Sequence, residues 1–200
     1  MSNLYKHIEN LKDKFGLNVI VALNRYNTDT LEEIKYVQES LEEKGIQSSL
    51  VEVWAKGGEG AIDIAQKLVE LTEKEENFKY IYDLQDTIKT KIEKVARDIY
   101  GAEGVEFSEE ASQEIDRIEK LGDGNLPVCI AKTQYSFSDD AKNLECKEPF
   151  KITIREINLK AGAGFVVAIA GKIMTMPGLP RVPAAESIDI DENGNIVGIF

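Results

Sequence analysis

The chain has 200 residues, 42% of them hydrophobic and 30% charged, so it can bury one large core or two small ones. Its formal net charge of -12 argues against a nucleic-acid-binding or anionic-membrane-binding surface, since both need clustered Lys and Arg. No apolar run reaches the roughly 18 residues of a membrane span, and the N-terminus lacks the apolar segment of a signal peptide, so we expect a cytoplasmic protein.

The residues that usually bind metals are sparse. Cys129 and Cys146 lie far apart without ligand spacing, so we interpret them as reduced thiols. His7 is the only histidine, which argues against a histidine-based metal site or catalytic triad. The sequence therefore indicates no metal ligand and no catalytic residue in this chain.

The first half of the chain alternates between helical and strand patterns. A continuous apolar run at 19–23 is typical of a strand covered on both faces. Thr28 or Asp29 is a candidate cap for the helix that follows, and Gly45 a candidate end. The expected elements are a helix in 1–17, strands at 19–23 and 50–53, and helices at about 29–44, 60–72 and 81–99.

The second half repeats this alternation. Ser108 is a candidate cap for a helix. The apolar alternation in 151–159 changes phase, which predicts a β-bulge near Arg155 and Glu156. Asn193-Gly194 between apolar runs predicts a hairpin. The other expected elements are a helix at 108–121, strands at 127–132 and 165–170, and a proline-rich loop at 176–183 that lines a ligand site or braces two domains.

These patterns predict an α/β protein of two small three-layer-like domains, residues 1–101 and 102–200. Each has a short, mainly parallel sheet flanked by helices, and the second ends in a β-hairpin. The boundary is placed at Gly101–Gly104, where the long helical stripe stops.

Polar and aromatic residues follow the first two expected strands. Asn24, Arg25 and Tyr26 come after one strand, and Trp54 and Lys56 after the other. Ligands of open parallel sheets lie beyond the carboxyl ends of the strands, so we expect both loops to line one crevice. Two aromatic faces can hold a flat heteroaromatic ring between them. The structural alternatives are that Trp54 packs in the core and that the Asn and Asp residues only stabilise their loop.

The glycine-rich loop at 57–60 has two interpretations. Its free backbone N–H groups, with Lys56, could hold a carboxylate or phosphate. Alternatively it is a tight turn in which Glu59 complements a helix dipole, and this interpretation is favoured because an acidic side chain opposes a phosphate. No G-x-x-x-x-G-K-[ST] motif occurs, so the chain has no phosphate-binding P-loop of its own.

Five motifs together resemble one family. In order they are Asn-Arg-Tyr-x-Thr-Asp at 24–29, Val-Trp-Ala-Lys-Gly-Gly-Glu-Gly at 53–60, Ala-Lys-Thr-Gln-Tyr-Ser-Phe-Ser at 131–138, Gly-Ala-Gly-Phe at 162–165 and Met-Thr-Met-Pro-Gly-Leu-Pro at 174–180. This succession resembles the C-terminal part of formate–tetrahydrofolate ligase, which acts in one-carbon metabolism, and it covers essentially the whole chain. The family more often has Phe-Pro where this chain has Tyr26-Asn27, and Pro where it has Ala141.

The resemblance implies an ATP-dependent ligase that joins formate to tetrahydrofolate through formyl phosphate and gives 10-formyltetrahydrofolate. It implies that Tyr26 and Trp54 stack on the folate ring. Arg25 and Lys56 are the local cations available to the folate carboxylates, and Asn24, Arg25 and Lys56 complete the expected substrate-binding residues. In the family, ATP and Mg²⁺ bind to an N-terminal P-loop domain that this chain lacks, so none is expected bound tightly here, and the complete enzyme is expected to be a homo-oligomer.

Three hypotheses follow from this resemblance. The chain is the folate-binding part of a ligase and is inactive alone. Alternatively it is a folate-binding module or subunit that needs a separate ATPase chain. A third alternative is a structural remnant without a ligand.

Overall fold

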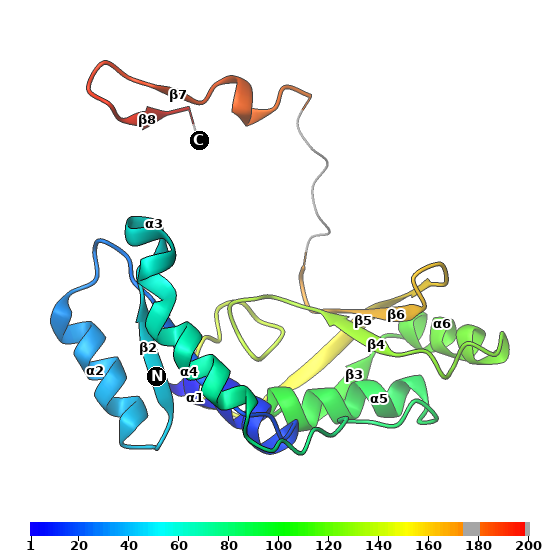
Figure 1. Ribbon diagram of the computed structural model, residues 1–200. Helices are drawn as coiled ribbons and strands as arrows, with labels where there is room; N and C mark the ends of the chain where they lie inside the picture. The colour runs from blue at the N-terminus through cyan, green and yellow to red at the C-terminus, as the bar shows by residue number, and fades with distance from the viewer. Residues whose placement is uncertain (174–180, 199–200) are drawn as a thin grey trace.

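The structure is a computed structural model that describes residues 1–173 and 181–198 (Figure 1). It is a mixed α/β protein whose small, parallel-dominated sheets are flanked by helices, with an antiparallel hairpin near the C-terminus, as predicted. The proline-rich segment predicted at 176–183 lies largely outside the described residues.

A two-stranded parallel sheet organises the first half. Its elements are α1 (Ser2–Glu9), the π-helical turn η1 (Asn10–Lys14), β1 (Ile20–Asn24), α2 (Leu31–Glu42), β2 (Gln47–Val51), α3 (Val53–Lys56), the 3-10 turn η2 (Gly57–Ala61) and α4 (Ile62–Thr72). The sheet lies between α2 and α4 (Figure 1). Ile8 of α1, Val21 of β1 and Leu41 of α2 form its buried cluster.

Two details of the first half differ from the expectation. The cap of α2 is Thr30, not Thr28 or Asp29, because Thr30 and Glu33 form a reciprocal capping box. The second strand occupies 47–51 rather than 50–53, since Glu52 already leaves the extended conformation at φ -128° and ψ 36°. Trp54 therefore lies in the helical turn after the strand and not at its tip.

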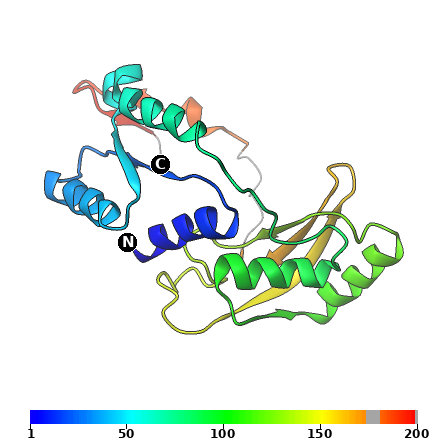
Figure 2. The same cartoon turned by 60° about the horizontal axis from the view of Figure 1, so that its bottom comes forward.

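A four-stranded mixed sheet organises the second half. Its elements are α5 (Ile88–Val95), the π-helical turn η3 (Ala96–Tyr100), β3 (Gly104–Phe107), α6 (Glu109–Lys120), β4 (Val128–Ala131), β5 (Lys151–Lys160) and β6 (Phe165–Ala170). The strand order is β3-β5-β6-β4, parallel in both outer pairs and antiparallel between β5 and β6. α5 and α6 cover one face (Figure 2).

The predicted cap of α6 is confirmed, since Ser108 accepts a hydrogen bond from the Ala111 N–H. The predicted bulge is also confirmed, because the register shifts between Ile154 and Glu156. The hairpin appears as β7 (Asp189–Ile190) and β8 (Ile196–Val197), preceded by the 3-10 turn η4 (Ala184–Glu186). Gly194 takes a φ of +82° in its turn, a conformation that glycine adopts without strain.

The helix predicted at 81–99 starts only at Ile88. The side chains of Asp83 and Asp86 accept backbone N–H groups of the preceding turn, and Thr87 caps the helix. Such local side-chain hydrogen bonds compete with a helical turn. The sequence patterns did not predict β3. A four-residue edge strand carries little periodic signal, and the residues of β5 that pair with it lie 47 positions later in the sequence.

The buried core of the second sheet contains residues from both sides of the expected boundary. Ile88, Ile92 and Ala96 belong to the same cluster as Ile152 and Val166. The division at residue 101 stays a prediction.

Candidate functional site

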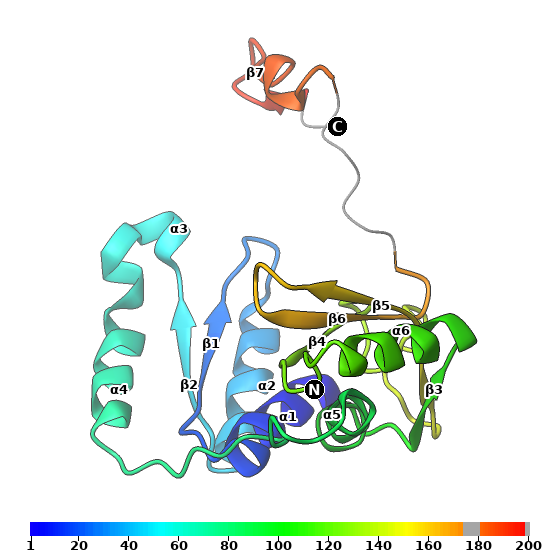
Figure 3. The ribbon, with the colours of Figure 1, turned by 90° about the vertical axis from the view of Figure 1, so that its right-hand side faces the viewer.

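The two polar loops leave the first sheet at the same edge. Asn24 and Val51 are partners in the parallel register, and the Arg25 N–H extends the ladder with a 3.1 Å bond to the Val51 carbonyl. β1 and β2 run in the same direction, and α3 lies beyond the end of β2 (Figure 3). The carboxyl ends of both strands therefore present their loops side by side.

A hydrogen bond from Trp54 ties one loop to the other. The indole Nε1 donates to the backbone carbonyl of Arg25 at 2.9 Å. Trp54 is 63% exposed, so the alternative that it packs in the core is wrong. Its polar edge is thereby held against the first loop while much of the ring faces solvent.

Tyr26 is equally exposed, at 64%. Its position is set by a compact turn, in which Asp29 Oδ2 accepts from the Tyr26 N–H at 2.7 Å and the Asp29 N–H donates to the Tyr26 carbonyl at 3.1 Å. Within the described residues the Tyr26 and Trp54 rings do not stack on each other. Both aromatic surfaces are accessible to a ligand.

Glu52 holds both of the predicted cations. Arg25 Nη1 donates to one of its carboxylate oxygens at 2.8 Å, and Lys56 Nζ donates to the other at 2.5 Å. These two donors, Lys56 first and Arg25 second, lower the pKa of Glu52 below its ordinary value. The three side chains together carry one net positive charge, so the site is less cationic than Arg25 and Lys56 alone suggest.

Sequence reasoning missed Glu52. The available signal was its position between a strand and a helical turn, four residues before Lys56, which is the spacing of a helical ion pair. Asn24, by contrast, is exposed at the end of β1, and within the described residues its side chain has no hydrogen bond. Of the five predicted residues, the structure brings Arg25 into contact with Trp54 and joins Arg25 and Lys56 through Glu52.

The glycine-rich loop contains a close backbone contact. The Glu52 N–H donates to the Gly60 carbonyl at 3.1 Å, and a Cβ on Gly60 would lie only 2.5 Å from the Glu52 carbonyl carbon. The helical turn begins at Val53, earlier than expected, and Gly57 adopts a φ of +58° to connect α3 to η2. This packing supports the tight-turn interpretation.

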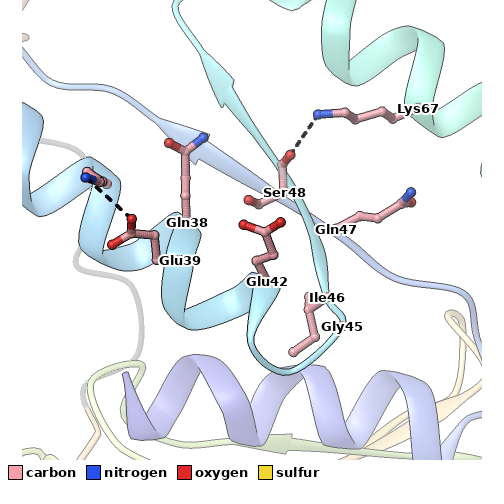
Figure 4. A pocket seen from close by; sticks show the side chains of 9 residues that line it. Gln38, Glu39, Glu42, Gly45, Ile46, Gln47, Ser48 and Lys67 are labelled. Carbon is pink, nitrogen blue, oxygen red and sulfur yellow. Dashed lines mark hydrogen bonds and ion pairs between the residues drawn. The ribbon is translucent and has the colours of Figure 1, made fainter.

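Two cavities in the described part of the chain lie away from these loops. A cavity of about 600 Å³ lies between α2 and the start of β2, where Lys67 Nζ donates to the Ser48 carbonyl at 3.0 Å. Figure 4 shows the side chains that line it. It lies at the opposite end of β2 from Trp54. A larger apolar groove of about 1010 Å³ is lined by Phe15, Tyr80, Tyr82 and neighbouring residues. No predicted site residue lines either cavity.

Residues 1–173 and 181–198 contain no group of three or more His, Cys, Asp or Glu side chains placed to hold a metal ion. None of the helices in the same ranges has the length and apolar character that a membrane crossing requires.

Comparisons with known proteins agree on one family. The sequence model of a family described as formate--tetrahydrofolate ligase matches residues 1–200. The curated formate--tetrahydrofolate ligase of Symbiobacterium thermophilum is 52% identical over 199 residues. That alignment covers 100% of this chain but 36% of the relative, so the chain spans about a third of the relative's length.

Proposed function

The chain belongs to the formate–tetrahydrofolate ligase family, and from that membership we propose that it supplies the folate-binding side of the ligase site. The observation that carries the proposal is the hydrogen bond from Trp54 to Arg25, which holds two exposed aromatic side chains on adjacent loops. The pyrimidine half of the reduced pterin of tetrahydrofolate is planar, and stacking of such a face on an aromatic side chain contributes about 1 kcal/mol per contact.

In this proposal, formate is activated elsewhere in the complete enzyme. ATP phosphorylates formate to formyl phosphate with release of ADP, and the N10 amine of tetrahydrofolate then attacks the formyl carbon while phosphate leaves. The P-loop motif that would hold the ATP phosphates does not occur in this chain. Tyr26 and Trp54 orient the pterin so that N10 faces the activated formyl group.

Arg25 and Lys56 provide little net positive charge for the carboxylates of folate. Glu52 already neutralises half of the positive charge of Arg25 and Lys56, and the chain carries a net charge of -12. The carboxylates of folate, and the further ones of its polyglutamate forms, therefore need positive charge from elsewhere in the enzyme. Asn24 is exposed beside Arg25 and is free to contact the pterin.

A folate-binding module that works with a separate ATPase chain is the second candidate. Both candidates predict that the isolated chain binds folate without ATP-driven turnover. Mixing the chain with the separately produced remainder of the Symbiobacterium relative distinguishes these two candidates from a structural remnant that binds no ligand. Ligation is restored only if the chain supplies a functional folate-binding half of the site. The complete ligase, in either case, we propose to be a homo-oligomer that uses ATP and Mg²⁺.

The direct test is a fluorescence titration, because Trp54 is the only tryptophan. Tetrahydrofolate is expected to quench its emission with saturation, while p-aminobenzoylglutamate, which lacks the pterin, should not. Absence of saturable quenching by tetrahydrofolate contradicts the proposal. Robust ATP-driven ligation by the isolated chain contradicts the assignment as an inactive part.

A further inference from the structure

The backbone on both sides of the Tyr26 Cα atom is held by hydrogen bonds. Just before it, the Arg25 N–H donates to the Val51 carbonyl at 3.1 Å, and the Arg25 carbonyl accepts from Trp54 Nε1 at 2.9 Å. The next two groups, the N–H and the carbonyl of Tyr26, are both bonded to Asp29, at 2.7 Å and 3.1 Å. Because four successive backbone groups have partners, the direction of the Tyr26 Cα–Cβ bond is fixed although the residue is 64% exposed.

Asp29 closes this turn with two different groups. Its backbone N–H donates to the Tyr26 carbonyl, which is the closing bond of a β-turn over residues 26–29. Its side-chain Oδ2 atom accepts from the Tyr26 N–H, a second bond that an alanine at this position could not form. Hydrogen bonds to an ionised carboxylate are shorter and stronger than those between neutral groups. The carboxylate is therefore the part of Asp29 that does more than close an ordinary turn.

The far end of the turn is held by α2, the helix that follows the loop (Figure 1). Thr30, the residue after Asp29, donates its N–H to Glu33 Oε2 at 2.9 Å, and its Oγ1 accepts from the Glu33 N–H at 3.2 Å. Asp29 thus connects a capped helix to the backbone of Tyr26. The central residues Asn27 and Thr28 are exposed, and within the described residues the Asn27 N–H has no hydrogen-bond partner.

We propose that Asp29 is a positioning residue for tetrahydrofolate, because its carboxylate orders the turn that presents the Tyr26 ring before the ligand binds. A ligand that must itself order a loop binds more weakly than one that meets an ordered loop. This inference rests on the proposed function for the identity of the ligand. The order of the turn is measured without folate, so a failure of folate binding and a failure of the positioning role give different results.

The first measurement is a titration of Trp54 fluorescence with tetrahydrofolate in the unmodified chain and in two variants of Asp29. Asp29→Ala should bind about threefold to fivefold more weakly, since the turn loses its side-chain bond. Asp29→Asn keeps an oxygen that can accept from the Tyr26 N–H, and its affinity should stay within about twofold of the unmodified chain. Unchanged affinity in Asp29→Ala overturns the proposal, and so does an Asp29→Asn variant that binds as weakly as Asp29→Ala.

A proline tests whether the effect acts through the order of the turn. Asn27 is the second residue of the turn, where proline pre-sets φ, and Asn27→Pro removes an N–H that has no partner in the described residues. In the Asp29→Ala background it should recover affinity about twofold or more, whereas in the unmodified chain it should have a smaller effect. Equal effects in the two backgrounds overturn the proposal, because the Asp29 carboxylate then acts on the ligand by another route.

The chain contains a matched control in the turn before α5. There the Asp83 N–H donates to Asp86 Oδ2 at 2.9 Å, and the Asp86 N–H donates to the Asp83 carbonyl at 3.1 Å, which is the same pair of bonds. Asp86→Ala removes the equivalent carboxylate and also a bond from Lys94. It should lower stability but leave tetrahydrofolate affinity unchanged. Equal losses of affinity in Asp86→Ala and Asp29→Ala overturn the positioning role, since they indicate a general effect of stability.

The second measurement is backbone ¹⁵N relaxation without folate. The order parameters of Asn27 and Thr28 should be about 0.85 in the unmodified chain, as in rigid backbone, and should fall below about 0.6 in Asp29→Ala. Order that is unchanged in Asp29→Ala overturns the proposal whether or not folate binds. A turn that loosens in Asp29→Ala, in a chain whose unmodified form shows no saturable quenching by tetrahydrofolate, contradicts the proposed function and with it the positioning role, while Asp29 still orders the turn.

Discussion

The indole Nε1 of Trp54 donates a 2.9 Å hydrogen bond to the backbone carbonyl of Arg25, across a sequence separation of 29 residues. This contact joins the loop after β1 to the helical turn after β2. It uses the one polar atom of the indole and leaves the residue 63% exposed. The ring is therefore positioned by the protein while its surface remains available.

Replacing Trp54 with alanine should weaken tetrahydrofolate binding about fivefold, the equivalent of one stacking contact of about 1 kcal/mol. The melting temperature should change little, because the side chain is mostly exposed. Isothermal titration calorimetry and thermal unfolding measure the two effects. Trp54→Phe keeps an aromatic face but loses the Nε1 donor, so its tetrahydrofolate affinity should lie between those of the unmodified chain and Trp54→Ala. Unchanged affinity in Trp54→Ala contradicts a role in stacking.

Tyr26 has a well-matched control in Tyr36, which is 63% exposed on α2. Tyr26→Ala should reduce folate affinity about fivefold through loss of its ring, whereas Tyr26→Phe should have a small effect. Tyr36→Ala removes an equally exposed phenol away from the loops and should bind as the unmodified chain does. Equal losses in the two alanine variants indicate a nonspecific effect of removing surface aromatic residues.

The contribution of Glu52 to the stability of the fold should depend on pH in the acid range. Its pKa is lowered in the folded chain by Lys56 and Arg25, so the interaction stabilises the fold above the ordinary glutamate pKa of about 4.3 and is lost as pH falls through the lowered folded-state value. Denaturant unfolding of the chain and of Glu52→Gln between neutral and acid pH should show that the stability difference shrinks at low pH. A difference that stays constant over this range rules out this linkage.

The same Glu52→Gln variant changes the charge of the site by one unit. Removing the carboxylate leaves Arg25 and Lys56 without their shared partner. Binding of a polyglutamated folate should become tighter and more sensitive to salt, because exposed charges are screened. Titrations at two salt concentrations, with a monoglutamate folate as the control ligand, measure this effect.

Gly60 and Gly58 form a pair that tests the packing of the glycine-rich loop. Gly60→Ala would place a Cβ 2.5 Å from the Glu52 carbonyl carbon and should destabilise the fold by roughly 1–3 kcal/mol. Gly58→Ala meets no heavy atom within 4 Å and should be tolerated. Chemical denaturation gives both values, and equal stability of the two variants argues against the close contact.

Lys91 connects α5 to the loop between α6 and β4. Its side chain is fully buried, and Nζ donates to the carbonyls of Gly124 at 2.7 Å and Leu126 at 2.9 Å, while burial lowers its pKa. Lys91→Met leaves both carbonyls without this donor and should cost roughly 2–3 kcal/mol of unfolding free energy. Lys120→Met, on the exposed surface of α6, is the control and should be nearly neutral. An unchanged free energy of unfolding in Lys91→Met would show that water replaces the amine as the donor to these carbonyls.

Local patterns were sufficient for much of the fold. Ser108 caps α6 as expected, since an N-cap depends on a few neighbouring residues. The phase change in 151–159 predicted the bulge at Ile154/Glu156, because a strand that buries one face must restore its alternation. Asn193-Gly194 predicted the hairpin turn for a similarly local reason.

The failures involve competing or distant contacts. The start of α5 depends on Asp83, Asp86 and Thr87, whose side chains stabilise a turn where the apolar stripe favours a helix. β3 depends on a partner strand that forms 47 positions away. The domain division at residue 101 and the substrate-binding roles of the five predicted residues stay predictions.

The sequence by itself determined the α/β class, the order of most elements and the two loops that carry the aromatic residues, because these follow from short-range periodicity and from successive motifs. Only the tertiary structure decided that Trp54 bonds to Arg25 and that Glu52 neutralises part of the predicted positive charge. Each of these depends on which backbone and side-chain groups meet across many residues of sequence, and that pairing is determined only when the chain packs.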